Sequence, residues 1–339
     1  MSQTIKDIAE LAKVSVSTVS RVLNNKSDVS SKTKDKILKL MDDRGYEPNS
    51  IARGLVSHKT FTIGLIIPDI SNPFFAELAL CIENRAKDFG YSVIFYNTDN
   101  ENQREKDATK LMQSKMVDGV IVSFSKDGKE DIKLLNNILP TVQIDRKIQD
   151  VDCSGVFVDN KISAYNATKY LTELGHRKIV HFTGNLKTLT GLDRLEGFKN
   201  AVKDAGISDK DILIMEGRYS VDSGKNSMKK LLELDFKPTA LFAASDLQAA
   251  GALYVAGHAG VKVPDDLSII GHDDIDLSYL VNPNLTTMEQ PKKELGKLAM
   301  DLLIKKIEKR SSKIISDYEN DIVLNTKLVI RESTGKLQK

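Results

Sequence analysis

Carboxylate, guanidinium and aromatic side chains follow several short apolar runs in this sequence. They occur in the segment DISNPFF that begins at Asp69 and in the pairs Asp145-Arg146, Asp159-Asn160, Ser245-Asp246 and Asp273-Asp274. Aromatic faces cover C–H surface, and charged groups form paired hydrogen bonds with hydroxyls. The set therefore suits a small polyhydroxy ligand such as a sugar.

A second group of residues whose side chains could bind a partner lies near the N-terminus. There, Ser17 and Arg21 share one face of a short helical pattern. A hydroxyl donates and accepts hydrogen bonds, and the Arg fork matches two major-groove acceptors of guanine. Residues 1–59 carry 11 Lys/Arg against 7 Asp/Glu, a net charge of +4, whereas the other residues carry 38 against 40. A small basic segment on a near-neutral body indicates a nucleic-acid-binding module on a larger domain.

Alternating strand and helix patterns must position the carboxylates and aromatics of the body. Strands are predicted at 62–67, 91–96, 119–122 and 141–144, with helices around 74–89, 101–116 and 129–138. The order repeats, with strands at 178–182, 212–215, 239–243 and 267–270 and helices near 161–174, 192–205, 222–234 and 246–258. Two such runs predict two doubly wound parallel-sheet lobes, whose ligands bind beyond the carboxyl ends of the strands.

Three short helical patterns fit into residues 4–45. Thr4 with Asp7 predicts a capping box for the first helix, Ser15 can cap the second, and a third begins near Ser30 or Ser31. A helix, a tight turn, a second helix and a bracing helix form the geometry that inserts the second helix into a major groove. A plain three-helix bundle without a partner has the same spacing, so the spacing alone leaves both alternatives open.

The N-terminal region resembles the DNA-binding headpiece of the LacI/GalR family. The resemblance rests on TIKDIAELAKVSVSTVSRVLN and VSSKTKDKILKLMDDRGYEPNSIARGL, an unbroken match. It implies that Val16, Ser17 and Arg21 read the major groove, with Val16 limited to apolar contact such as a thymine methyl. The other headpiece residues expected at the DNA are Thr4, Ser15, Thr18, Asn24 and Ser30.

Residues 49–56 resemble the hinge helix of the same family, which is helical only on operator DNA. The resemblance implies DNA contacts from Asn49, Ala52, Arg53 and Leu55, with Leu55 as an apolar wedge in a minor-groove base step. An eight-residue helix that contains a glycine cannot persist alone in water. We therefore expect a flexible linker when DNA is absent.

The body resembles the ligand core of the same family, which is similar to periplasmic sugar-binding proteins. The resemblance rests on PDISNPFFAEL, QIDRK, LGHRKI, DRLEGF, VPDDLSIIGHDDID and TTMEQP. It implies a ligand cleft lined by Phe74, Phe75, Asp145, Arg146, Arg194, Tyr219, Ser245, Asp273 and Gln290. The Asp145-Arg146 pair is similar to the pair in the branch of the family that binds ribose or a related monosaccharide. Relatives usually carry Asn at the position of Ser245, and this departure leaves the identity of the sugar open.

These patterns divide the chain into a helix-turn-helix domain (1–48), a hinge helix with linker (49–60) and a two-lobed body (61–333). We expect about 61–160 and 292–321 in the first lobe and about 161–291 and 322–333 in the second. The predicted fold class is an all-α headpiece plus an α/β body like that of periplasmic binding proteins. The tail lacks the leucine heptads of the family's tetramers, so we expect a homodimer.

The sequence predicts a transcriptional repressor that binds pseudo-palindromic operator DNA and is controlled by a small sugar that closes the cleft. Whether the sugar weakens or tightens DNA binding stays open, because purine and catabolite regulators of the family bind DNA more tightly with their effector. The alternative is a catabolite-control regulator with a phosphorylated carrier protein as corepressor. The segment DISNPFFAEL permits that alternative, and the Asp145-Arg146 pair argues against it.

Other classes of protein fit the sequence less well. No glycine-rich nucleotide motif, serine elbow or zinc pair occurs, and the five histidines lack ligand spacing, so we expect no enzymatic activity, metal or cofactor. No apolar signal core or run of eighteen apolar residues occurs, so we expect neither export nor a membrane span. We expect a cytoplasmic protein in which Cys81 and Cys153 are buried, reduced thiols.

Overall fold

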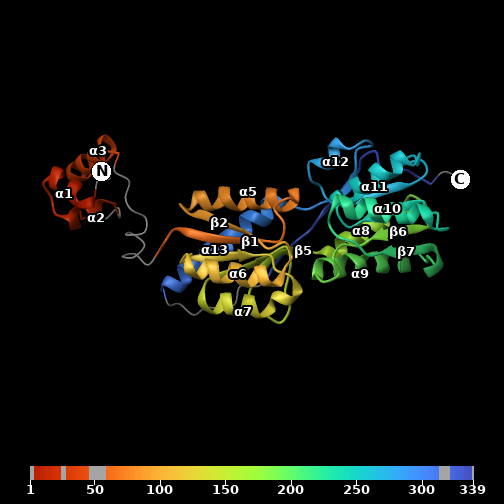
Figure 1. The fold of residues 1–339 in the computed structure, drawn as a ribbon, viewed down its shortest axis with the longest axis horizontal. Helices are drawn as coiled ribbons and strands as arrows, with labels where there is room; N and C mark the ends of the chain where they lie inside the picture. Colours follow the sequence, from red (N-terminus) through yellow and green to blue (C-terminus); the bar gives the residue numbers. More distant parts are fainter. Residues whose placement is uncertain (1–3, 24–27, 46–58, 313–320, 338–339) are drawn as a thin grey trace. The chain divides into compact units, whose positions relative to one another are not determined.

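The computed structural model describes residues 4–23, 28–45, 59–312 and 321–337. The chain forms two compact units, residues 1–60 and residues 61–339 (Figure 1). Five residues with predicted DNA contacts lie outside the described residues, so their contacts stay predictions: Asn24, Asn49, Ala52, Arg53 and Leu55.

The described residues of the first unit form three helices. They are α1 (Ile5–Ala12), α2 (Val16–Leu23) and α3 (Ser31–Asp43). Each helix contributes a fully buried side chain to one small core, namely Ile8, Val19 and Ile37. The apolar spacing in the sequence thus produces the predicted three-helix headpiece, because each helix buries one apolar stripe.

Two six-stranded sheets form the cores of two lobes in the second unit. The first sheet contains β1 (Thr62–Ile67), β2 (Ser92–Asn97), β3 (Gly119–Val122), β4 (Thr141–Ile144), β5 (Gly155–Val158) and β11 (Ile322–Leu324). The second contains β6 (Ile179–Phe182), β7 (Ile212–Met215), β8 (Ala240–Ala243), β9 (Ser268–Asp273), β10 (Thr286–Glu289) and β12 (Lys327–Val329). The strand orders are β11-β5-β4-β3-β1-β2 and β12-β10-β9-β8-β6-β7. Neighbouring strands are parallel except β12, which is antiparallel to β10.

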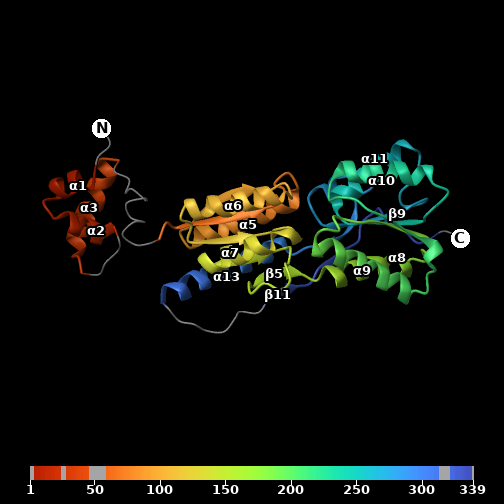
Figure 2. The same cartoon turned by 60° about the horizontal axis from the view of Figure 1, so that its bottom comes forward.

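Helices cover both faces of each sheet (Figure 2). The first lobe has α5 (Pro73–Asp88), α6 (Asn102–Ser114), α7 (Lys129–Ile138) and α13 (Lys292–Ser312), and a short 3-10 helix, η1 (Lys126–Gly128). The second has α8 (Asn160–Glu173), α9 (Leu189–Asp204), α10 (Val221–Glu233), α11 (Asp246–His258) and α12 (Leu277–Leu280), and η2 (Asp209–Asp211). The predicted pair of doubly wound parallel-sheet lobes is confirmed.

Alternation along the strands divides each lobe into two apolar layers. On β1, Leu65 and Ile67 pack toward α5 and α13, whereas Ile66 packs toward α6 and α7. In the second lobe α10 and α11 cover one face, and α8 and α9 cover the other. The central strands are therefore buried on both faces, which explains their continuous apolar runs.

The chain crosses between the lobes at three short segments, here called the crossings. The first is Asp159 between β5 and α8, the second is Gln290-Pro291 between β10 and α13, and the third is Asn325-Thr326 between β11 and β12. The sequence places the last crossing at residues 321 and 322, but Ile322–Leu324 pairs with β5 in the first lobe. That boundary is wrong because a three-residue, half-buried edge strand has too little periodicity to be assigned to a sheet.

The two cysteines differ in their surroundings. Cys153 is buried, and burial raises its pKa to about 11. Cys81 on α5 is partly exposed, so the prediction that both thiols are buried is wrong for this residue. Helix α13 packs closely against Cys81, where a Cβ on Gly296 would come within 2.8 Å of the Cys81 Cβ. Among the described helices, none is long and apolar enough to span a membrane.

Candidate functional site

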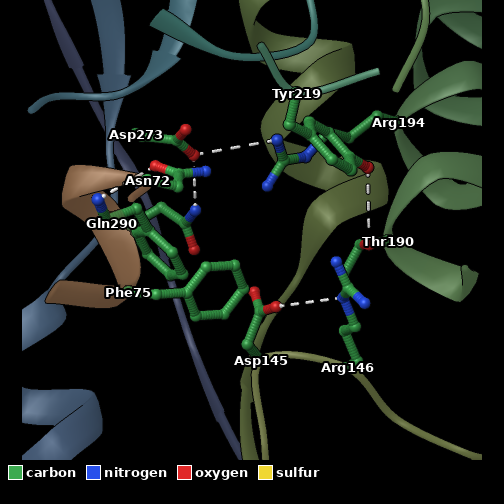
Figure 3. A pocket seen from close by; sticks show the side chains of 10 residues that line it. Asn72, Phe75, Asp145, Arg146, Thr190, Arg194, Tyr219, Asp273 and Gln290 are labelled. Carbon is green, nitrogen blue, oxygen red and sulfur yellow. Dashed lines mark hydrogen bonds and ion pairs between the residues drawn. The ribbon is translucent and has the colours of Figure 1, made fainter. Parts of the chain in front are cut away.

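The loop after β1 brings two aromatic rings to the carboxyl edge of the first sheet. Asn72 caps α5 by accepting the amide of Phe74, and Pro73 occupies the first turn, where a helix needs no N–H donor. This cap fixes the direction of Phe74 and Phe75, whose ring centroids lie 5.0 Å apart in an edge-to-face arrangement. Both rings are buried and line a cleft (Figure 3).

Asp145 and Arg146 follow β4 and form a buried ion pair in the same cleft. Arg146 Nε lies 3.7 Å from Asp145 Oδ2, and Arg146 Nη1 donates to Asn100 Oδ1 at 2.7 Å. Asp145 has a positive φ of 63°, which non-glycine residues adopt seldom and mostly at special sites. Burial raises the pKa of Asp145 to about 6, although Arg146 and Arg194 counteract this rise.

Three polar groups surround one oxygen of Asp273, the last residue of β9. Gln290 Nε2 donates to Asp273 Oδ1 at 2.7 Å, His272 Nδ1 lies 3.1 Å from it, and Arg194 Nη1 lies 3.8 Å from it. None of these contacts uses Oδ2. The backbone of Asp273 has a φ of 117°, outside the regions that L-residues favour. The surrounding contacts therefore hold a strained residue in one orientation at the cleft.

One buried acceptor of the cleft is the side-chain oxygen of Gln290. Its Oε1 forms no hydrogen bond with any described residue, whereas its Nε2 is engaged by Asp273. That bond fixes which end of the amide carries the oxygen. An unpaired buried acceptor costs about 1–3 kcal/mol, so a ligand that donates an O–H or N–H here gains binding free energy.

Arg194 on α9 connects the second lobe to the first crossing. Its Nε donates to Asn160 Oδ1 at 2.8 Å, and its guanidinium carbon lies 5.6 Å from the ring centroid of Tyr219. Thr190, one turn earlier on α9, has its hydroxyl 3.5 Å from the Tyr219 hydroxyl. The Arg194 side chain is almost fully buried. Its Nη1 donates to the Ala244 carbonyl oxygen at 2.5 Å and lies 3.8 Å from Asp273 Oδ1 (Figure 3).

Ten side chains line the cleft around about 290 Å³ of empty space, part of which is open to solvent. They are Asn72, Phe74, Phe75, Asp145, Arg146, Thr190, Arg194, Tyr219, Asp273 and Gln290. Acceptors, cationic donors and aromatic faces lie on different walls of this cleft.

Eight of the nine ligand residues expected from the sequence line this cleft, and Ser245 does not. Ser245 is fully buried as the N-cap of α11, where its Oγ accepts the amide of Gln248 at 3.3 Å. Its short side chain is satisfied by its own helix. Sequence reasoning missed Asn72 and Thr190. The Asn-Pro cap signal could have indicated Asn72, whereas Thr190 has no local signal.

The remaining strand-end carboxylates have structural partners. Asp159 caps α8 by accepting the amide of Ile162 at 2.8 Å. Asp246 Oδ2 accepts the amide of Ile275 at 2.9 Å. Asp274 pairs with Arg331, whose Nη2 lies 2.7 Å from Oδ1. These residues fix the loops around the cleft and are not part of its lining.

The outer face of α2 presents the side chains that the sequence assigns to base reading. Val16 is 40% exposed, and Ser17 and Arg21 are also exposed. Arg21 Nη1 lies 3.2 Å from Asp28 Oδ2, and both side chains are more than half exposed. Such an exposed pair is weak, so the guanidinium can exchange Asp28 for a nucleic-acid partner.

Hydroxyl residues hold the helix starts of the headpiece. Thr4 forms the predicted capping box with Asp7, and Ser15 Oγ accepts the amide of Thr18 at 3.1 Å. Ser30 caps α3. Helix N-termini carry partial positive charge and unpaired N–H groups, which suit contacts with phosphate. The structure therefore gives these hydroxyls a capping role beside the predicted DNA contacts.

Two family models together match nearly the whole chain. Residues 4–49 match the model of bacterial regulatory proteins of the lacI family, and residues 60–321 match the model of periplasmic binding proteins and the sugar binding domain of the LacI family. The chain belongs to the LacI family. Its headpiece and two-lobed body are the two parts that these models describe.

Named members of the LacI family are similar to this chain over almost its full length. The ribose operon repressor of Halalkalibacterium halodurans is 40% identical over 331 residues, which cover 98% of this chain and 97% of that protein. Catabolite control protein A of Priestia megaterium is 39% identical over 313 residues, 92% of this chain and 94% of that protein. The lac repressor dimer bound to operator and the anti-inducer ONPF has a TM-score of 0.89 at 26% identity, covering 99% and 100% of the two chains.

These matches give the molecule a general role. It is a LacI-family DNA-binding transcriptional repressor with a sugar-binding domain, as the sequence predicts. The helices of residues 4–45 are its DNA-binding headpiece, and the cleft between the sheets lies within the part that matches the sugar-binding model.

Proposed function

We propose that this repressor responds to D-ribose or a pentose of similar shape bound in the cleft. The observation that carries the proposal is a set of hydrogen-bond acceptors with fixed orientation. The main one is Gln290 Oε1, which bonds no described residue and lies beside the Asp273 carboxylate. Each sugar hydroxyl offers one donor and accepts from a cation. Asp145 and Arg146 supply both partners on the opposite wall.

The aromatic lining favours a ligand with a single sugar ring, and the similarity to a named relative favours ribose. The rings of Phe74 and Phe75 cover the C–H surface of a single sugar ring. A relative named ribose operon repressor is 40% identical to this chain, which supports ribose among the pentoses.

The proposed active form is a homodimer on a pseudo-palindromic operator, with one headpiece at each half-site. Three large apolar side chains support a self-association surface, because Leu80, Tyr279 and Leu280 are each more than half exposed. Leu80 lies on α5 and the other two lie on α12, and these helices lie on the same side of the two lobes in Figure 1. A contact surface that includes both lobes would sense their relative movement.

In this proposal ribose is an inducer. Binding closes the two lobes on the sugar, the dimer partners shift, and the hinge segments of residues 49–56 lose their paired position on the DNA. Operator affinity then falls because the leucine wedge at Leu55 no longer contributes. Phosphate contacts from the basic headpiece supply the salt-dependent part of the remaining affinity.

Operator binding with and without sugar tests the proposal. Half-sites selected in vitro with the full-length protein would serve as probe, and D-ribose, D-xylose, L-arabinose and D-glucose would be titrated at fixed salt. We expect ribose to weaken operator binding by about tenfold or more. Arg194→Ala should bind the operator as the parent does but not respond to ribose, because Arg194 lies in the cleft and far in sequence from the headpiece. Unchanged affinity with every sugar would contradict the proposal.

A second candidate is regulation by a phosphorylated carrier protein. It has support from the 39% identity to catabolite control protein A. In the same assay, a phosphorylated carrier protein that tightens operator binding, with sugars lacking effect, would favour this candidate. The sugar proposal predicts that the carrier protein, phosphorylated or not, leaves ribose-dependent release unchanged.

A further inference from the structure

A series of buried and partly buried hydrogen bonds leads from the cleft to the third crossing. His272 Nδ1 lies 3.1 Å from Asp273 Oδ1, and His272 Nε2 lies 2.8 Å from Ser163 Oγ. Thr326 Oγ1 donates to the same Ser163 Oγ at 2.8 Å. His272 and Ser163 are fully buried, and neither lines the cleft. We call Asp273, His272, Ser163 and Thr326 the relay.

The donors of the relay can be assigned in one consistent direction. Because Thr326 donates to Ser163 Oγ, the Ser163 hydroxyl proton can be donated to His272 Nε2. Nε2 is then an acceptor, so the imidazole carries its proton on Nδ1 and donates it to Asp273 Oδ1. Burial, with a contribution from Arg194, lowers the pKa of His272 to about 4, which keeps the ring neutral at pH 7.

Each crossing is connected to Asp273 by a short path. Ser163 lies in the first turn of α8, directly after the first crossing, and Thr326 belongs to the third crossing. Gln290, from the second crossing, donates to Asp273 Oδ1. A movement of the lobes must change the backbone at the crossings, so it changes these contacts together. Asp273 is the point where the ligand and all three crossings meet.

We propose that His272 is a positioning residue that fixes the Asp273 carboxylate for the ligand and transmits its position through Ser163 to Thr326 at the third crossing. The inference rests on the proposed function, since it names how an occupied cleft acts on the lobes. It assigns His272 two separate bonds with two separate effects. The bond to Asp273 supports ligand affinity, and the bond to Ser163 supports the coupling between ligand and DNA.

Two amide substitutions separate the two bonds. His272→Asn places an amide where Nδ1 lies, so it retains a donor to Asp273 and loses Ser163. His272→Gln reaches the position of Nε2, so it retains Ser163 and loses Asp273. We expect the His272→Asn variant to bind D-ribose within about threefold of the parent but to lose most ribose-dependent operator release. The His272→Gln variant should bind ribose about tenfold more weakly, because it lacks the hydrogen bond to the Asp273 carboxylate. If His272 has only a structural role, both variants should lose ribose affinity and operator release equally. That outcome would contradict the proposal.

Hydrogen–deuterium exchange on the ligand-free, full-length protein tests the relay without any sugar. Thr326→Val replaces the hydroxyl by a methyl of similar size. We expect about fivefold faster exchange both at residues 325–329 and at the cleft end of β9, residues 272–275. Thr168→Val is the matched control. Thr168 lies on α8, as Ser163 does, and among the described residues its buried hydroxyl donates to the Ala164 carbonyl and not to the relay.

The two experiments distinguish failure of the relay from failure of the proposed effector. The relay would be overturned if Thr326→Val exchanged faster at residues 325–329 alone. It would also be overturned if the control Thr168→Val exchanged faster at both segments. If the parent shows no ribose binding but Thr326→Val changes both segments, the effector is wrong and the relay stands. Nitrogen chemical shifts of His272 add a check, since the relay requires a neutral ring protonated at Nδ1 at pH 7.

Discussion

Asp145 is the cleft residue whose charge depends most directly on its surroundings. Its carboxylate is buried beside Arg146, and burial raises its pKa to about 6 even though two arginines counteract the rise. Both oxygens of a carboxylate accept hydrogen bonds from sugar hydroxyls, whereas one oxygen of the protonated acid carries a proton and acts as a donor. In the proposed function, the protonation of this residue would therefore control how tightly the cleft binds a sugar.

Ribose affinity is expected to decrease as the pH falls through about 6. Above this pH the free protein has Asp145 ionised and ready to accept. Below it, the ligand must first displace a proton, which weakens binding by at most tenfold for each pH unit. Titration calorimetry from pH 5 to 7 measures this slope.

Asp145→Asn is the control for that slope, because an amide does not titrate. The variant should bind ribose more weakly at pH 7 and show a flat profile between pH 5 and 7. His181 and His272, whose pKa values burial lowers to about 4, stay neutral over the same range. Parallel profiles for parent and variant would assign the pH dependence to another group.

At the level of elements, close backbone contact between helices holds the second lobe together. Gly251 on α11 lies against α10, where an added Cβ would come within 2.1 Å of the Val221 carbonyl oxygen. Gly224 on α10 lies against α11 in the same way, 2.0 Å from the Gln248 carbonyl oxygen. These contacts involve backbone atoms, so neither helix can yield without shifting as a whole.

Gly251→Ala is therefore expected to destabilise the protein by roughly 1–3 kcal/mol through overpacking. Gly257→Ala is a control on the same helix, because an added Cβ there meets nothing within 4 Å. It should be neutral or stabilising by up to about 1 kcal/mol, since alanine favours a helix over glycine. Urea unfolding of both variants measures the difference. Equal stabilities would mean that α10 and α11 can separate at little cost.

At the level of the whole molecule, apolar side chains of both lobes are available for self-association. Leu280 is 71% exposed on α12, and Leu80 is 60% exposed on α5. Isolated exposed leucines are common, but two large ones on helices that lie on the same side of the two lobes in Figure 1 favour a contact surface. In a dimer formed there, a movement of one lobe relative to the other would change the contacts with the partner subunit.

Leu280→Asp is expected to shift the protein from dimer to monomer, because a carboxylate would be buried without a partner in the interface. Operator affinity should fall with it, since two half-sites are no longer bound together. Leu134→Asp is the matched control, because Leu134 is 48% exposed on α7 and is not part of this surface. Sedimentation equilibrium gives the masses. A dimeric Leu280→Asp variant, or an equally monomeric Leu134→Asp variant, would place the interface elsewhere.

Local patterns in the sequence were sufficient for most of the architecture. The runs at Thr62–Ile67, Gly119–Val122 and Thr141–Ile144 form strands with the predicted bounds, because strands buried on both faces are continuously apolar. The rule that ligands bind beyond the carboxyl ends of parallel strands predicted Asp145 and Asp273 at one site from the sequence alone. Edge strands such as Ile322–Leu324 escaped detection, since their pairing depends on a partner rather than on their own composition.

The sequence alone determined which residues could form helices, strands and a polar cleft, because periodicity and residue chemistry are local properties. Only the tertiary structure decided that Ser245 caps a helix and that Gln290 Oε1 bonds none of the described residues. It also decided that Ser163 and Thr326, 163 positions apart, share a hydrogen bond. Such contacts depend on distances between segments that folding brings together. The physical reason is that a hydrogen bond requires two groups within about 3 Å, and residue spacing along the chain does not contain that distance.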